Sequence, residues 1–479
     1  MTLYRCNICN VFEYDPARGN SLTGIKPGTE PGNFPDDWRC PICDSDKTHL
    51  IPVQQSRVPA AGPVPGKGEA TEGFLAEWER KSDELEILMA DIHLMATTGE
   101  SIIEPMRTMK PVISWDDILI KGAQIAKIPV NSTVAVNTRT IIGPKARYPM
   151  VIETPVYVTH MSYGALSKEV KIALARGSAA VKTAIGGGEG GVLPEERQEA
   201  YRYIFEYVPN RYSVTEANLR AADAIEIKIG QSAEPGMGAR LPAEKVTPEI
   251  ARVRGYPEGT DILSPASHED IRNRDALREK VSWLRETSGG KPVGVKIAAG
   301  DIEEDLEAIL YSQPDFITID GRPGATGAAA KYIKAATSVP TIYALHRARK
   351  YLDRNGANGV SLVITGGLRV SSDFARALAL GADAIAIGTA ALMACGCQQY
   401  RICQTGRCPV GVTTQAQELR ARQDPAIAAR QLGHYLRVST EELKDFARLT
   451  GNTDVHALSI RNLCTTNSEI SNYTSIPHV

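Results

Sequence analysis

The sequence has no long hydrophobic run. No stretch of about 18 apolar residues, the length that spans a bilayer, occurs in its 479 residues. The N-terminus, MTLYRCNICN, lacks the basic and then apolar pattern of a secretion signal. The net charge is only −2 with both signs plentiful, which argues against nucleic acid or an anionic membrane as the main partner. We therefore expect a cytoplasmic globular protein.

Cysteine is scarce outside two short segments. One group lies near the N-terminus, a second lies within residues 395–408, and Cys464 stands alone. Tight groups of thiols in a reducing compartment favour metal binding over disulfides. The two groups are Cys6, Cys9, Cys40 and Cys43, and Cys395, Cys397, Cys403 and Cys408.

The composition predicts three parts. Residues 1–50 contain few long apolar runs, and so short a domain usually needs a metal or disulfide to fold. Residues 51–72 are rich in Pro, Gly and Ala without periodicity, which is typical of a linker. Residues 73–479 form the main domain. It opens with a helix over residues 73–99 that we expect to pack through one apolar stripe: Phe74, Trp78, Leu85, Leu88, Ile92 and Met95.

Short β-rich runs alternate with helical segments beyond residue 150. Several runs are apolar on both faces, as buried parallel strands are. Eight of them predict an α/β fold, a (β/α)8 TIM barrel with its site at the C-terminal strand ends, and a doubly wound open sheet is the alternative. The runs span residues 156–160, 182–186, 203–208, 224–230, 293–298, 316–321, 360–366 and 384–388.

Two C-x-x-C knuckles, CNIC at 6–9 and CPIC at 40–43, supply four thiolates for one zinc or iron ion. The text between them, YRCNICNVFEYDPARGN and FPDDWRCPICDSDK, closely resembles rubredoxin, which implies a mononuclear iron that transfers electrons. Structural zinc is the alternative. Asn10 and Asp44 replace the glycines that rubredoxins usually carry after each knuckle, and both residue types tolerate left-handed backbone.

Glycine-rich stretches follow the sixth, seventh and eighth predicted strands. Barrels commonly bind phosphate at the loops after strands seven and eight, so Gly366, Gly367, Gly388 and Thr389 are candidates, with glycines for tight turns as the simpler interpretation. A formal dinucleotide fingerprint at residues 186–191 is discounted because VLPEE, and not a long helix, follows it.

Several motifs resemble the FMN-binding synthase domain of glutamate synthase over most of residues 100–470. They include HMSYGALSKEV, IEIKIGQSAEPG, IDGRPGATGAA and ITGGLRVSSDFARAL, in the family's order. The segment CQQYRICQTGRCPVGV is similar to the family's iron–sulfur segment, and the resemblance implies that Cys397, Cys403 and Cys408 hold a [3Fe-4S] cluster. The additional Cys395 leaves a [4Fe-4S] cluster open.

The resemblance also implies roles for individual residues. Lys296 is expected to stabilise reduced flavin, and as a lysine within a buried strand it requires a partner. Lys228, Gln231 and Arg211 are expected to bind the dicarboxylate 2-oxoglutarate, with Glu189 as a weaker candidate. Lys296, Lys228 and Gln231 are the expected catalytic residues. His160 and His268 are expected to be packed or hydrogen-bonded histidines. The residues expected at FMN are Met161, Ser162, Tyr163, Gly164, Ser167, Gln231, Lys296, Asp320, Gly324, Thr326, Gly327, Gly366, Gly367, Gly388 and Thr389.

The implied reaction is reduction of 2-iminoglutarate, formed from 2-oxoglutarate and ammonia, to L-glutamate. The rubredoxin domain would deliver electrons through the iron–sulfur cluster. The N-terminal cysteine of a glutaminase is not found, so ammonia is expected to be free or to come from a separate subunit, and the electron donor is expected to be a separate reductase. A homo-oligomer is compatible with this account. Two alternatives stay open: an N-methylglutamate synthase-like or other amine and keto-acid oxidoreductase, and an electron-transfer subunit of a larger complex.

Overall fold

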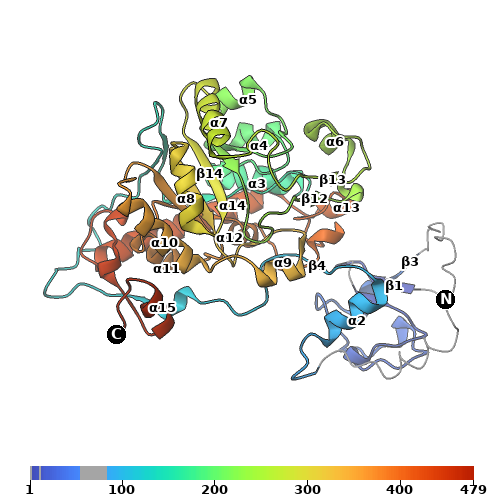
Figure 1. The fold of residues 1–479 in the computed structure, drawn as a ribbon. Helices are drawn as coiled ribbons and strands as arrows, with labels where there is room; N and C mark the ends of the chain where they lie inside the picture. Colours follow the sequence, from blue (N-terminus) through green and yellow to red (C-terminus); the bar gives the residue numbers. More distant parts are fainter. Residues whose placement is uncertain (1–2, 10–11, 54–82) are drawn as a thin grey trace. The chain divides into compact units, whose positions relative to one another are not determined.

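The computed structural model describes residues 3–9, 12–53 and 83–479. The chain divides into two compact units, Met1–Ile103 and Glu104–Val479 (Figure 1). The division comes later than the expected start of the main domain at residue 73, so residues 83–103 group with the N-terminal unit.

The N-terminal unit is built on a small antiparallel sheet. Strand β1 (Leu3–Cys6) lies between β2 (Glu13–Tyr14) and β3 (Leu50–Val53). Between β2 and β3 the chain forms three short 3-10 helices: η1 (Ser21–Thr23), η2 (Pro31–Asn33) and η3 (Lys47–His49). Aromatic side chains fill the core, with Tyr14 and Phe34 meeting edge to face at 4.8 Å. Strand β3 extends past residue 50, so the linker expected to begin at residue 51 begins later, and from residue 54 on it lies outside the described residues.

The helix expected over residues 73–99 is shorter than predicted. Helix α2 (Met89–Thr98) begins at Met89 and ends at Gly99, whose φ is +68°. Leu85, Leu88, Ile92 and Met95 are exposed, so the predicted packing stripe is wrong for these four residues. Leu88, Ile92 and Met95 do recur at the spacing of one helical face, but apolar residues off that face, such as Leu94, are exposed as well, so spacing does not distinguish a packed face here. Phe74 and Trp78 lie outside the described residues.

The second unit is a closed barrel of eight parallel strands, in the spatial order β10-β11-β14-β15-β17-β18-β8-β9. Each strand falls within or close to a run that the sequence predicts, so the barrel is confirmed and the open doubly wound sheet is excluded. The strands are β8 (Val156–Val158), β9 (Ala184–Gly186), β10 (Arg202–Tyr207), β11 (Ala224–Lys228), β14 (Val293–Ala298), β15 (Phe316–Asp320), β17 (Ser361–Thr365) and β18 (Ala384–Ile387).

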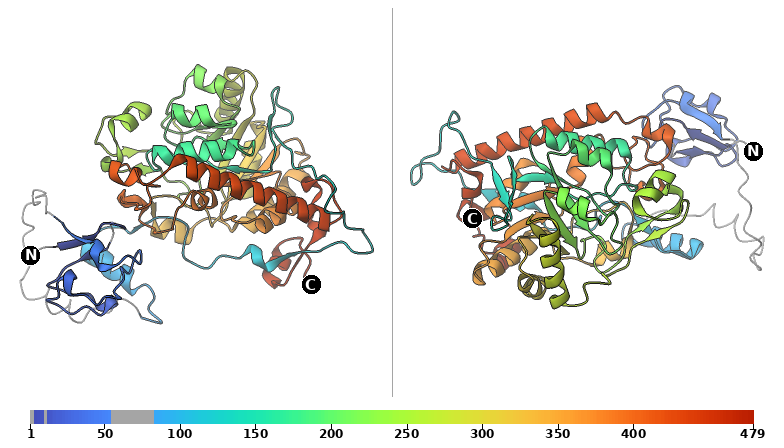
Figure 2. Two further views of the ribbon diagram at one scale, coloured as in Figure 1. Left: turned by 180° about the vertical axis from the view of Figure 1, so that it is seen from behind. Right: turned by 90° about the horizontal axis from the view of Figure 1, so that it is seen from above.

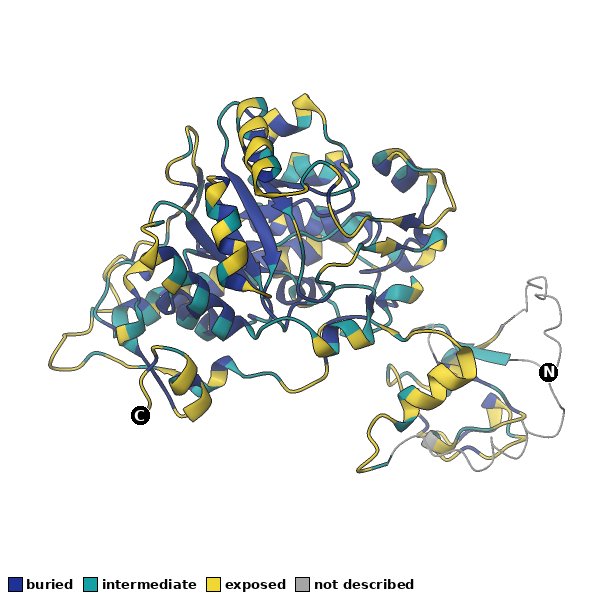
Figure 3. Ribbon diagram, viewed as in Figure 1, coloured by how far each residue is buried: buried dark blue, intermediate teal, exposed yellow. Residues whose placement is uncertain are grey.

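Helices surround the barrel, and its strands are buried between them (Figure 3). The long C-terminal helix α14 lies along α3 (Figure 2). A Cβ at Gly177 of α3 would lie 2.8 Å from Leu432 of α14, so glycine allows this close packing. The helices are α3 (Lys168–Ala179), α4 (Pro194–Glu199), α5 (Glu216–Ala221), α6 (Pro248–Arg254), α7 (Arg274–Thr287), α8 (Ile302–Tyr311), α9 (Lys331–Ala336), α10 (Thr341–Arg354), α11 (Ser371–Ala379), α12 (Thr389–Ala394), α13 (Gln417–Arg420), α14 (Pro425–Leu449) and α15 (Ser468–Tyr473).

A β-hairpin covers the N-terminal end of the barrel. Ile142, Met150 and Ile152 of this hairpin pack with Tyr157 and Ile204 of the barrel strands, leaving the opposite, C-terminal end for the site. The hairpin is one of several short strand pairings, whose members are β5 (Ile118–Ile120) with β19 (Leu463–Thr465), β6 (Thr140–Ile142) with β7 (Met150–Ile152), and β12 (Arg240–Leu241) with β13 (Ile262–Leu263). Two further short strands are β4 (Ile103–Glu104) and β16 (Ala329–Ala330). Among the described residues, every helix is too short or too polar to cross a membrane.

Candidate active site and metal centres

The main cavity lies at the C-terminal ends of the barrel strands and has a volume of about 190 Å³. Residues from the loops after β8, β9, β11, β15 and β18 line it. A smaller cavity of about 60 Å³ shares His160, Gln231 and Gly388 with the main one. Together the two cavities collect most of the predicted site residues: Met161, Ser162, Glu189, Lys228, Gln231, Lys296, Asp320, Gly324, Thr326, Gly327, Gly366, Gly367, Gly388 and Thr389.

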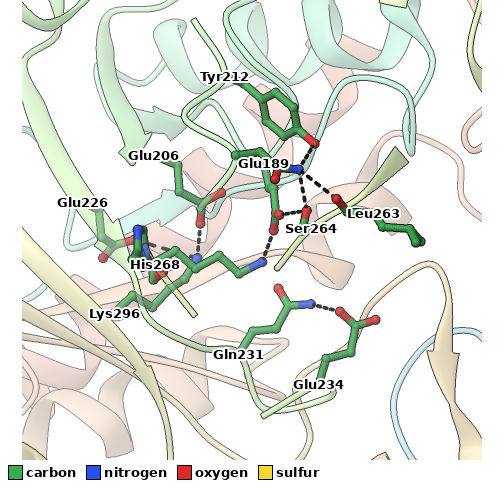
Figure 4. Close-up of polar contacts among 12 residues, drawn as sticks. Glu189, Glu206, Tyr212, Glu226, Gln231, Glu234, Leu263, Ser264, His268 and Lys296 are labelled. Atoms are coloured by element: carbon green, nitrogen blue, oxygen red, sulfur yellow. Dashed lines mark hydrogen bonds and ion pairs between the residues drawn. The ribbon is translucent and has the colours of Figure 1, made fainter. Parts of the chain in front are cut away.

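Lys296 of β14 lies in a buried network of charges. Its ammonium contacts the carboxylate of Glu206 in β10, and its Nζ lies 4.0 Å from Oε2 of Glu226 in β11 (Figure 4). His160 Nε2 lies 2.7 Å from the same Glu226 oxygen. Burial raises the pKa of Glu206, but the positive charges of Lys296 and His160 outweigh it and lower the pKa to about 2. The partner that Lys296 requires in the barrel interior is therefore a glutamate that is ionised at neutral pH.

Lys228 ends strand β11, and its ammonium contacts Glu189, which also accepts a hydrogen bond from Ser264 (Figure 4). Burial lowers the pKa of Lys228, but the carboxylates of Glu189 and Glu206 raise it by a larger amount. The net pKa therefore lies above the ordinary value. A fully charged lysine is thus fixed at the cavity wall by a glutamate that we expected to bind substrate directly.

Gln231 follows Lys228 around the cavity rim. Its Nε2 donates a 2.9 Å hydrogen bond to Oε2 of Glu234 (Figure 4). Burial raises the pKa of Glu234, and the neighbouring Glu189 raises it further. Lys228, Gln231 and Thr326 oppose this, and the net pKa is about 7. The cavity therefore contains a carboxyl group that titrates near neutral pH.

The loop after β17 supplies the backbone of the smaller cavity. Gly366 and Gly367 have φ values of +104° and +91°. A Cβ would lie 2.4 Å from the carbonyl oxygen of Gly321 at the first position and 2.3 Å from Pro323 Cβ at the second, so only glycine fits. Arg369, two residues farther on, also lines this cavity, and its burial lowers the pKa of the guanidinium.

Four predicted residues lie outside the two cavities. The Tyr163 hydroxyl donates to Glu249 at 2.7 Å, and Ser167 caps the N-terminus of α3. Gly164 lies beneath the cavity wall, where a Cβ would approach Leu241 at 2.9 Å. The structure does not bring Arg211 to the substrate cavity. Its left-handed turn after β10, with φ of +53°, leaves the guanidinium near Asp270 at 3.6 Å.

The two histidines behave as expected. His268 Nε2 lies 2.8 Å from the carbonyl oxygen of Lys228, and its ring stacks on Tyr207. His160 is held by Glu226, although it also lines both cavities.

Cys397, Cys403 and Cys408 line one small cavity together with Met106 and Thr413. Burial raises the pKa of the Cys397 and Cys403 thiols. Cys395 is not among the lining residues: its Sγ lies 3.8 Å from the carbonyl oxygen of Ala428, in the hydrophobic core. The three lining thiols therefore share a site from which the fourth is separate.

The cysteine cavity adjoins the main cavity. Met106, Cys397, Cys403 and Thr413 line both. Lys245, another residue of the main cavity, donates hydrogen bonds to the carbonyl oxygens of Cys403 at 2.6 Å and Thr413 at 3.3 Å. A buried cation thus lies against the cysteine segment.

The four N-terminal cysteines converge. All four sulfurs lie within 4.8 Å of one another, with Cys6 and Cys43 at 3.7 Å and Cys9 and Cys40 at 3.9 Å. Four thiolates at about 2.3 Å from one ion would lie about 3.8 Å apart, so the residues fit a tetrahedral metal. Asp44 has a φ of +60°, as its place after the knuckle predicts, and Asn10 lies outside the described residues.

Hydrogen bonds favour the thiolate form of Cys6, whereas burial raises the pKa of Cys40. The Ser45 hydroxyl lies 3.2 Å from the sulfurs of both Cys6 and Cys43. Burial raises the pKa of Cys6, but hydrogen bonds from Ser45 and the backbone outweigh it and lower the pKa to about 7.

Sequence reasoning missed Glu206, Glu226, Glu234, Lys245 and Arg369. Glu206 and Glu226 interrupt apolar strands in the same way as Lys296, and that signal was present in the text YIFEYV and AIEIKIG. Glu234, Lys245 and Arg369 lie in loops or short turns, where a charged residue is usually solvated and its spacing gives no indication of a cavity.

Comparison with known proteins identifies two matching family models. A model described as the conserved region in glutamate synthase matches residues 114–453, and a rubredoxin model matches residues 3–50. Solved structures of mandelate oxidase align over 73% of this chain and 87% of theirs, with a TM-score of 0.46 and 17% identity.

Three relatives illustrate the similarity along the sequence. A glutamate synthase large subunit-like protein of Rhizobium meliloti is 35% identical, over 81% of this chain and 92% of its own length. An archaeal-type glutamate synthase [NADPH] of Thermotoga maritima is 39% identical, over 73% and 74%. An archaeal glutamate synthase [NADPH] of Methanocaldococcus jannaschii is 38% identical, over 71% and 65%.

Proposed function

We propose that this chain reduces 2-iminoglutarate to L-glutamate. The chain belongs to the glutamate synthase family and is a glutamate synthase-type oxidoreductase. The imine would form in the main cavity from 2-oxoglutarate and ammonia.

The observation that carries the proposal is the position of Lys228. Its ammonium faces the main cavity and is oriented by Glu189, which uses one of its three protons. The remaining protons can bind a carboxylate of the keto acid, and the side-chain amide of Gln231 lies at the same wall. Arg211, which points elsewhere, takes no part in this proposal.

The two adjoining cavities suit FMN. The backbone of Gly366, Gly367 and Gly388 with the Arg369 guanidinium would hold the phosphate. Lys296 would place its positive charge at the flavin ring. The backbone of Met161 and Ser162, which line the main cavity, would also contact the ring. When bound, FMN supplies conversion between single electrons and hydride. Lys296, held by Glu206, needs no rearrangement to stabilise negative charge there.

The metal centres complete the proposal. Cys397, Cys403 and Cys408 line one cavity, and the separation of Cys395 supports a [3Fe-4S] cluster over a [4Fe-4S] cluster. The N-terminal cysteines would hold one iron ion, and electrons would pass from it through the cluster to the barrel site. Ammonia and the reductant would come from separate partners.

Substitution of Lys228 tests the substrate assignment. K228A is expected to raise the half-saturating 2-oxoglutarate concentration at least tenfold, since a charge-assisted hydrogen bond contributes about 1.5–3 kcal/mol. K350A, which removes an exposed lysine of α10, is the matched control. An unchanged 2-oxoglutarate requirement in K228A, with flavin bound, would contradict the proposal.

A further inference from the structure

Three glutamates line the main cavity, and they differ in their partners. Glu189 contacts Lys228, and Glu206 contacts Lys296. Glu234 pairs with no lysine, arginine or histidine within ion-pair distance in the part of the chain that the structure describes. Among the described residues, one cavity carboxylate therefore has neutral hydrogen-bond partners and no ion-pair partner.

The surroundings of Glu234 hold it at the cavity without neutralising it. One carboxylate oxygen accepts the Gln231 amide at 2.9 Å, and Thr326 also interacts with the carboxylate by hydrogen bonding. These neutral donors fix the side chain's position, and a carboxylate with two oxygens can accept further hydrogen bonds. Burial, and to a smaller extent Glu189, raises the pKa of Glu234, and the positive charge of Lys228, which is not within ion-pair distance, offsets only part of this.

Charge and size define what fits beside Glu234. A keto acid carboxylate would be repelled there and attracted to Lys228. A small ammonium ion has the opposite preference, because it can donate hydrogen bonds to the Glu234 carboxylate and bring a positive charge within ion-pair distance of it. Met106, Leu241 and Ala325 also line the cavity, so it offers apolar surface to a small alkyl group on the nitrogen.

We propose that Glu234 forms the amine subsite of this cavity, binding ammonium or a small primary alkylammonium ion and taking a proton from it. The inference rests on the proposed function and names the residue that handles its nitrogen substrate. The neutral amine then adds to the keto carbon that Lys228 holds nearby.

Glu234 accepts one proton and later returns it, so the proposed reaction is balanced. The carboxylate takes one proton from the ammonium, and the free amine forms a C–N bond with the keto carbon as the C=O π bond opens. The keto oxygen takes a proton from the added nitrogen and becomes a hydroxyl group. The protonated Glu234 returns this proton to the hydroxyl group, which leaves as water when the C–O bond breaks. The products are an iminium ion and a regenerated carboxylate, ready for reduction, so this half of the reaction needs no oxidant or reductant.

The test compares E234Q, E234D and E244Q with the wild-type holoenzyme. Glu244 is an exposed glutamate of η5 (Ala243–Lys245) and is not among the residues that line either cavity, so E244Q makes the same chemical change outside the site. Ligand-observed NMR of the methylammonium methyl signal measures binding to the oxidised protein without turnover. Reoxidation of reduced flavin, at varied ammonium, methylammonium and 2-oxoglutarate, measures the requirement for each substrate.

E234Q is expected to weaken methylammonium binding about ten- to a hundredfold and to raise the half-saturating amine concentration similarly, because a charge-assisted hydrogen bond is lost. The 2-oxoglutarate requirement should change less than twofold, E234D should be intermediate, and E244Q should match the wild type. Unchanged amine binding in E234Q, or a shift in the 2-oxoglutarate requirement alone, would overturn the subsite. A wild-type protein that forms no amino acid with either amine would refute the proposed function, while the NMR titration would still decide the subsite.

Discussion

Lys245 donates a 2.6 Å hydrogen bond to the carbonyl oxygen of Cys403, so a lysine that is 6% exposed places its charge on the cysteine segment. A buried cation at this position would stabilise the more negative, reduced state of the cluster that we propose for these thiols. The same lysine orients the Cys403 and Thr413 backbone. The relationship ties a residue of the main cavity to the proposed electron entry point.

Replacing this cation should change the cluster's potential. K245M is expected to lower the midpoint potential of the cluster, whereas K245R should retain most of it, because a guanidinium keeps the charge. A redox titration followed by electron paramagnetic resonance measures both. An intact cluster with the wild-type potential in K245M would show that the charge does not act on it.

A hydroxyl group plays a similar part in the N-terminal unit. Ser45 Oγ lies 3.2 Å from the sulfurs of Cys6 and Cys43, and hydrogen bonds to thiolate sulfur favour the reduced metal. S45A is expected to lower the iron midpoint potential, while S21A, at an exposed serine of η1, leaves it unchanged. Optical redox titration of the two variants gives the comparison. A colourless N-terminal unit that contains zinc would contradict the iron assignment itself.

The separation of Cys395 from the other three cysteines predicts different results for two variants. C403S should lose the iron–sulfur signal and block flavin reduction through the N-terminal iron, but chemical reduction of the flavin should persist. C395A should keep the cluster, since Cys395 lies in the core near Ala428. Iron and sulfide analysis with flavin absorbance distinguishes them. Cluster loss in C395A, with the fold intact, would indicate that the fourth thiol is a ligand.

The Lys296–Glu206 pair predicts a dependence of stability on pH. The pKa of Glu206 is about 2 in the fold against an ordinary 4.5, so ionised Glu206 stabilises the fold above pH 4.5, and this contribution disappears as the pH falls toward 2. Its size is about 3 kcal/mol. In urea unfolding, E206Q should be less stable than the wild type at pH 7, and the difference should shrink at pH 3. A difference that stays constant, as expected for the exposed control E307Q, would contradict the assignment.

Much of the barrel could be predicted from the sequence. The eight strands are short, mostly apolar on both faces and separated by helical segments. Buried charged residues such as Glu206, Glu226 and Lys296 are exceptions to this pattern. The knuckles at Cys6 and Cys40 were also readable, because thiol spacing reflects local geometry that metal binding requires. Glycine turns such as the one at Gly366 could also be predicted, because a glycine-rich stretch follows the seventh predicted strand.

The electrostatic pairing could not be predicted. Lys228 and Glu189 are distant in sequence, and the pairing of β10 with both β9 and β11 brings their side chains together. Glu189, predicted as a weaker substrate contact, lines the cavity and contacts Lys228, and the predicted Arg211 lies near Asp270; sequence spacing indicates neither pairing. Helix α2 is a different case: its apolar residues lack a common face, and the tertiary contacts that would bury them are not encoded in local spacing.

The most direct test of the account is a single-turnover measurement. The holoprotein is reduced anaerobically, freed of excess reductant and mixed with 2-oxoglutarate and ammonium, while flavin absorbance and glutamate are followed. The account predicts prompt flavin reoxidation with a matching amount of glutamate. Flavin that stays reduced with 2-oxoglutarate and either ammonium or methylammonium, with cofactor and clusters present, would contradict it.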